Sequence, residues 1–190
     1  SLLVPFGCNS LEMSEEELSL KRFALAAGIN SEHLRKVGQQ LPQSIWEKVH
    51  NAARKIKKGK GHYNWEAGSS ISQVIANARQ QRYEHGIEVL FVDYLQKIKV
   101  PGARRYEAVS EIAGSLKDLA KELEITVVAL AQVKQVVDQR VTQELKPGDI
   151  WQSGMMNAMP NLGDFADSSE IEKELDMAVT LYRPEVHHFN

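Results

Sequence analysis

The sequence predicts an α/β fold built on a mostly parallel sheet. Two short runs, residues 89–92 (VLFV) and 125–131 (ITVVALA), are continuously apolar, as in strands that are buried on both faces of a parallel sheet. Helical patterns of apolar residues lie between and around these runs, and alternating strands and helices are typical of α/β folds. A chain of 190 residues is long enough for one domain with a sizeable core.

The composition limits the classes of function. A hydrophobic content of 43% with 25% charged residues is ordinary for a soluble globular protein. The net charge of −2 argues against general polyanion binding, so any nucleic-acid surface must be a local patch. The single Cys8 excludes an internal disulfide, and the sequence has neither an apolar run of membrane-spanning length nor a secretory signal pattern. We therefore expect a soluble, cytoplasmic protein.

The first expected elements are a strand-like stretch and a helix. Residues 1–8 (SLLVPFGC) are apolar but interrupted by Pro5 and Gly7, which indicates an edge strand or an artificial start of the chain. A helix follows, because Ser14 and Glu17 have the spacing of a capping box and glutamates fill the first turn.

The next segment is polar and partly basic. Residues 31–59 predict two helices, the second of which is opened by Pro42. For the basic run at residues 54–60 (RKIKKGK), a solvated helix end is favoured over a contact with nucleic acid. We interpret His62 as a loop histidine without a ligand-type partner, followed by a short strand at residues 63–65.

A β-α-β unit is expected in the middle of the chain. Ser69 or Ser70 caps a helix whose apolar face recurs at helical spacing and which ends at Gly86. The strand at residues 89–92 follows directly, so the helix connects two strands of one sheet.

The second half continues the alternation and then loses its periodicity. A Pro-Gly loop leads to a helix at residues 106–123, and the apolar run that follows ends in the amide Gln132. Residues 177–182 (MAVTLY) are a further strand candidate. Residues 141–165 are rich in Gly, Met, Asn and Pro, and a loop of that length is usually functional or disordered.

Asp93 ends the first apolar run and is the first candidate for chemistry. A carboxylate at the carboxyl end of such a strand lies where open α/β sheets bind their ligands. In P-loop nucleotide hydrolases, an acid in that place holds Mg²⁺. The alternative is a core strand that ends in Asp because this residue is common in turns, and the stretch alone favours neither interpretation.

Four stretches, in this order and spacing, resemble the C-terminal motor domain of the DnaB family of replicative DNA helicases. They are residues 9–18 (NSLEMSEEEL), 89–96 (VLFVDYLQ), 115–132 (SLKDLAKELEITVVALAQ) and 167–185 (DSSEIEKELDMAVTLYRPE). The resemblance implies a RecA-like, P-loop-NTPase-type three-layer sandwich, incomplete at both ends. Residues 1–190 would form a single, partial motor domain, with residues 141–165 as a long loop or insertion.

The resemblance also implies roles for three residues. Glu12 corresponds to the general base for the water that attacks the γ-phosphate, Asp93 to the acid associated with Mg²⁺, and Gln132 to an amide that senses the γ-phosphate. ATP and Mg²⁺ are the implied substrate and cofactor. The requirement is physically consistent, because phosphoryl transfer needs a positioned water, a metal ion and polar groups on the γ-phosphate.

Two loops that face the central channel of the family's ring correspond to residues 99–105 and to the stretch from residue 139 onward. The resemblance implies that Arg104, Arg105, Arg140 and Lys146 contact the phosphates of single-stranded DNA, without reading its sequence. The alternative for each of these residues is an ordinary solvated loop charge, and for any single one the two interpretations weigh equally.

The function implied is an ATP-dependent DNA helicase acting in DNA replication as a homo-hexamer, with a primase and a helicase loader as partners. The family's P-loop, GxxxxGK[ST], does not occur in the sequence, and the resemblance would place it before Ser1. A degenerate RecA-fold binding module without ATPase activity is therefore the alternative. The stretches SLEMS and DSSEIEKELD argue against a third class, the recombinase-like or clock-type ATPases.

Overall fold

The computed structural model describes residues 4–35, 42–132, 162–164 and 168–181. Four strands form one parallel sheet in the order β2-β1-β3-β4. Their bounds are β1 (Phe6–Ser10), β2 (Gly61–Asn64), β3 (Val89–Asp93) and β4 (Thr126–Ala129). The parallel sheet with intervening helices confirms the predicted α/β class.

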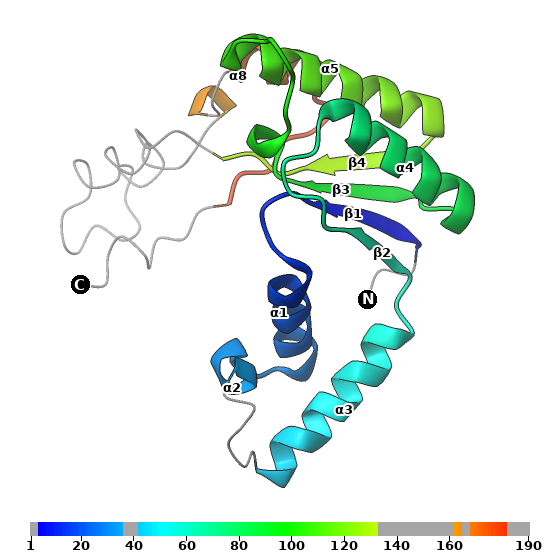
Figure 1. Ribbon diagram of the computed structural model, residues 1–190, viewed down its shortest axis with the longest axis vertical. Helices are drawn as coiled ribbons and strands as arrows, with labels where there is room; N and C mark the ends of the chain where they lie inside the picture. Colours follow the sequence, from blue (N-terminus) through cyan, green and yellow to red (C-terminus); the bar gives the residue numbers. More distant parts are fainter. Residues whose placement is uncertain (1–3, 36–41, 133–161, 165–167, 182–190) are drawn as a thin grey trace, which may run out of the picture.

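The helices form two groups on either side of the sheet (Figure 1). The first group, drawn above the sheet, is α4 (Ile71–His85), α5 (Arg105–Leu123) and α8 (Ser168–Glu174). The second group, drawn below it, is α1 (Glu15–Ala27), α2 (Ser31–Arg35) and α3 (Gln43–Lys57). Two short 3₁₀ turns, η1 (Leu95–Lys97) and η2 (Leu162–Asp164), complete the described elements.

Local interactions define the helix ends. The N–H of Glu17 donates to Ser14 Oγ at the start of α1, and Gly28 ends that helix in the left-handed conformation. At α4 the cap is Ser70, whose side chain and backbone exchange hydrogen bonds with Gln73, and Gly86 ends the helix. The charged residues of the basic run are exposed at the end of α3, as both a solvated helix end and a contact with nucleic acid would require.

One face of the sheet carries the core, and we call it the packed face. Leu90 and Val92 of β3 are fully buried there, because α4 and α5 pack across them. The helices contribute apolar residues at the predicted spacing, with Val74 and Ala78 from α4 and Val109, Ile112, Leu116 and Leu119 from α5.

The opposite face is aromatic and only half covered, and we call it the aromatic face. Phe6 lies edge-on to both Tyr63 and Phe91, with ring centroids 5.8 Å apart in each pair. These rings and Cys8 are partly exposed, and Val128 of β4 is 39% exposed.

β1 lies inside the sheet, so the prediction of an edge strand for residues 1–8 is wrong. Pro5 precedes the ladder, and its carbonyl accepts the N–H of Glu88 at 2.8 Å, so the missing proline N–H costs no strand pairing. Gly7 is closely packed, because a Cβ there would collide with the end of the Gln81 side chain of α4 and lie 3.0 Å from Ile87 Cδ1.

The strand predicted at residues 177–182 does not form in its described part, residues 177–181. Met177, Val179 and Leu181 are exposed there by 80%, 73% and 88%. A strand needs a neighbour for its backbone groups, and residues 177–181 pair with no strand in the described part of the chain, although the outer edge of β4 is unpaired there. Residues 141–165 lie outside the described residues except for the turn η2.

Candidate active site

The carboxyl ends of β1, β3 and β4 meet at one edge of the sheet. Ser10 pairs with Asp93, and the N–H of Leu11 donates to the carbonyl of Asp93 at 2.9 Å. On the other side of β3, the N–H of Leu95 donates to the carbonyl of Leu130 at 2.9 Å. The backbones that leave these three strands are thus tied together, at the position where parallel sheets bind ligands.

Glu12 and Asp93 form an acidic pair at this edge. Glu12 lies in the turn between β1 and α1, which Ser10 closes by donating its hydroxyl to the carbonyl of Met13 at 3.1 Å. Burial and then the charge of Glu12 raise the pKa of Asp93, whereas Lys21 lowers it. A carboxylate whose ionisation is disfavoured by a neighbouring negative charge is a favourable place for a cation.

A lysine that the sequence did not single out joins this pair. Lys97 ends η1, and its Nζ lies 3.5 Å from Glu12 Oε1. Its ammonium also lies 5.6 Å from the ring centroid of Tyr94. Tyr94 and then Glu12 raise the pKa of Lys97. The only signal in the sequence was its place four residues after Asp93, which does not by itself indicate a contact.

Gln132, the third predicted residue, lies exposed just beyond β4 and is held through its backbone. The side chain of Gln96 donates to the carbonyl of Gln132 and accepts its N–H, both at 3.3 Å. This reciprocal pair fixes the chain after β4 against the chain after β3. Sequence reasoning missed Gln96 because the partner is 36 residues away.

The predicted DNA contacts are placed only in part. Arg104 is exposed just before α5, and its N–H donates to Glu107 Oε2 at 3.0 Å. Arg105 is the first residue of α5. Arg140 and Lys146, from the second channel loop, lie outside the residues that the structure describes.

The acidic pair suits a magnesium ion better than a metal caged by protein. Mg²⁺ is usually bound by one or two carboxylates together with the phosphates of a substrate. Within the described ranges, no three His, Cys, Asp or Glu residues gather closely enough to hold a metal by themselves. Asp93, partly buried at a strand end, is the residue that fits such a shared site.

No helix in the described parts is long and apolar enough to cross a membrane.

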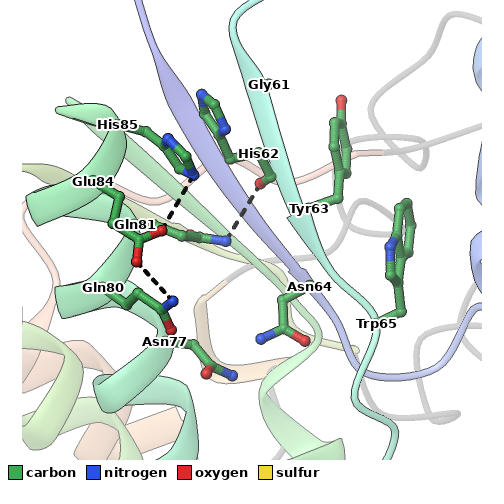
Figure 2. Close-up of a pocket in the computed structure, with 10 residues that line it drawn as sticks. All are labelled: Gly61, His62, Tyr63, Asn64, Trp65, Asn77, Gln80, Gln81, Glu84 and His85. Carbon is green, nitrogen blue, oxygen red and sulfur yellow. Dashed lines mark hydrogen bonds and ion pairs between the residues drawn. The ribbon is translucent and has the colours of Figure 1, made fainter.

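A pocket of about 430 Å³ lies elsewhere, between β2 and α4 (Figure 2). His62, expected in a loop, belongs to β2, and its ring stacks on His85 with centroids 3.7 Å apart. Burial and then His85 lower the pKa of His62. The side-chain amide of Gln80 donates to Glu84 Oε1 at 3.0 Å, and His85 Nε2 lies 3.7 Å from Glu84 Oε2. None of the predicted catalytic residues lines this pocket, so it is separate from the acidic pair.

The parallel sheet and the polar residues at its carboxyl edge define a RecA-like α/β domain. Two solved structures show the same fold. One, a solved ATPase domain, superposes with a TM-score of 0.80 at 25% identity, over 97% of this chain and 61% of that one. The other, a DnaB-like replicative helicase described with its interactions with primase, gives a TM-score of 0.81 at 25% identity, over 97% and 41%.

The chain belongs to the DnaB-like helicase C-terminal domain family, whose model matches residues 3–190. The replicative DNA helicase DnaB of Geobacillus stearothermophilus is 30% identical over 182 residues, and the replicative DNA helicase DnaC of Bacillus subtilis is 29% identical over 181 residues. Each alignment covers 94% of this chain but only 36% of the relative. The family membership confirms the resemblance that the four sequence stretches indicated.

Proposed function

We propose that this domain is the motor of a replicative DNA helicase, which hydrolyses ATP and thereby moves along single-stranded DNA. The observation that carries the proposal is the meeting of Glu12, Asp93 and the Gln132 backbone at the carboxyl edge of a sheet with the family's fold. The chain spans about a third of the curated relatives it matches, so the activity of the whole protein is part of the proposal.

In the proposed reaction, a water molecule attacks the γ-phosphorus and the bond from that phosphorus to the β,γ-bridging oxygen breaks. ADP and inorganic phosphate result, and Glu12 accepts the proton that the water gives up. The half-exposed carboxylate of Glu12 is open to a water from the solvent side, since 48% of the side chain is accessible. This access supports a role as base, whereas a fully buried acid would need a route for water.

Asp93 would hold the Mg²⁺ ion, which supplies charge neutralisation on the phosphates when bound. Gln132 would donate its side-chain amide to the γ-phosphate, and Gln96 would keep the Gln132 backbone in place. The sequence contains no GxxxxGK[ST] loop, so the proposal requires that the main phosphate cradle come from another segment or another chain.

We infer the partners of the proposed motor from its family. Single-stranded DNA would contact the loop that ends at Arg104 and Arg105, and also Arg140 and Lys146, through its phosphates. We further propose a cytoplasmic homo-hexamer that works with a primase and a loader. The solved DnaB-like replicative helicase that interacts with primase supports the choice of that partner.

The test is Mg²⁺-dependent ATP hydrolysis by the whole natural protein, with and without single-stranded DNA. Glu12→Gln keeps the size of the side chain and removes the base, so turnover should fall by at least about 100-fold, the usual contribution of a general base. The matched control is Glu16→Gln, an exposed acid in the first turn of α1, which should keep wild-type turnover.

The outcomes separate two classes of function. DNA-stimulated turnover that Glu12→Gln removes and Glu16→Gln retains supports the motor. Salt-sensitive DNA binding without any turnover would instead support a RecA-fold binding module, the second candidate. Equal turnover in Glu12→Gln and wild type would refute the assigned role of Glu12.

A further inference from the structure

We propose that Lys97 is a positioning residue through which DNA controls Glu12. Without DNA, the Lys97 ammonium holds the Glu12 carboxylate; when single-stranded DNA binds, one of its phosphates takes over the ammonium and Glu12 becomes free to act as base. The inference rests on the proposed function, and it adds a regulatory contact to the same site.

The contact itself is direct and exchangeable. Lys97 Nζ lies 3.5 Å from Glu12 Oε1, and the two side chains are 42% and 48% exposed. An ion pair this exposed contributes little net stability, because water solvates both partners and salt screens them. A phosphate of DNA can therefore compete for the ammonium without having to break a buried interaction.

The backbone around Lys97 is anchored, so the exchange would move the side chain and leave the fold unchanged. Ile98 is 6% exposed and belongs to the core. The N–H of Lys99 donates to the carbonyl of Ser69 at 3.0 Å, and the carbonyl of Lys99 accepts the N–H of Ile71 at 3.2 Å. The N–H and the carbonyl of Lys99 thus both fix the segment to the start of α4.

The same segment leads directly into the proposed DNA loop. Lys97 follows Asp93 by four residues and precedes Arg104 by seven, with the positive-φ turn at Gly102 between them. One short stretch of chain thus joins the metal-associated acid, the cation on Glu12 and the loop that would carry phosphate contacts. No other described lysine or arginine forms an ion pair with Glu12.

The experiment compares wild type, Lys97→Met and Lys97→Arg in the whole natural protein. Lys97→Met keeps the apolar stem and removes the charge, so Glu12 should be free at all times. We expect ATP turnover without DNA to rise about two- to fivefold, the range that an exposed ion pair allows. Turnover at saturating DNA should stay near wild type, so the stimulation ratio should fall by the same factor.

DNA binding gives a readout that does not depend on turnover. If Lys97 contacts one phosphate, the slope of log K against log salt should become shallower by about 0.7 in Lys97→Met, the value for one contact with a single strand. Lys97→Arg should restore both the low DNA-free turnover and the slope. The control Lys58→Met removes an exposed charge at the end of α3 and should change neither readout.

The failures can be told apart. An active wild type with an unchanged DNA-free rate and salt slope in Lys97→Met would overturn this inference and leave the proposed function standing. A fall of turnover both with and without DNA, together with a lower urea midpoint, would show a purely structural role and would also overturn it. A wild type that hydrolyses no ATP under any condition would overturn the proposed function and this inference together.

Discussion

The two faces of the sheet differ in how completely the chain covers them. On the packed face, Leu90 and Val92 are fully buried beneath α4 and α5, whereas on the aromatic face Phe91 is only partly covered and Val128 is 39% exposed. Adjacent residues of β3 therefore lie in very different surroundings, although they are equally apolar. Hydrophobicity along a strand thus tells little about how much each side chain stabilises the fold, and the helices above it decide that.

The largest expected effect is on the packed face. Leu90→Ala removes a fully buried side chain and leaves a cavity under α4 and α5, so the free energy of unfolding should fall by about 3 kcal/mol. Val128→Ala, on the aromatic face of β4, should lower it by less than about 1 kcal/mol because the side chain is already in contact with water. Urea unfolding of both variants measures the difference, and equal losses would refute the contrast between the faces.

An intermediate effect is expected from Gly7→Ala, which adds volume to the packed face. The new methyl group would meet Gln81 and Ile87, and overpacking should lower the free energy of unfolding by about 1–3 kcal/mol. Repeating the change in a Gln81→Ala background provides the control, because the shorter side chain leaves room for the methyl group. A loss of the same size in both backgrounds would mean that the cost has another source.

The smallest effect concerns His62 at the β2 edge of the packed face. Burial and then His85 lower the pKa of His62 in the folded protein, so below about pH 6.5 the unfolded chain binds more protons than the folded one. The free energy of unfolding therefore keeps its full contribution from neutral His62 above pH 6.5 and loses it as the pH falls below that value. Thermal unfolding between pH 7.5 and 5 should show the decline, and His62→Gln should make it shallower. An unchanged slope in His62→Gln would exclude this histidine as the source.

The sequence predicted most of what depends on neighbours along the chain. The strand that ends in Asp93, the cap at Ser70 and the apolar face of α5 were all expected, because apolar runs, caps and helical periodicity are local signals. The central place of β1 was not expected, since the order of strands is set by pairings between distant residues. The strand predicted at residues 177–182 was wrong over residues 177–181 for the same reason, because a strand pattern does not supply a partner strand.

For the candidate site, the sequence indicated the positions of Glu12, Asp93 and Gln132 but not their supports. Lys97 and Gln96 act on partners that are 85 and 36 residues away, so no spacing along the chain could reveal them. The stacking of His62 on His85 was missed because it joins a strand to a helix. The catalytic roles are proposals that the turnover experiments test.

The exposed end of the described chain has a consequence for handling the protein in solution. Met177, Val179 and Leu181 form an alternating apolar row without a strand partner among the described residues, and the outer edge of β4 is equally free there. Such edges are templates for pairing between molecules, and a net charge of −2 provides little colloidal repulsion. Where this edge stays uncovered, we expect molecules to pair through it, so self-association should increase with protein concentration.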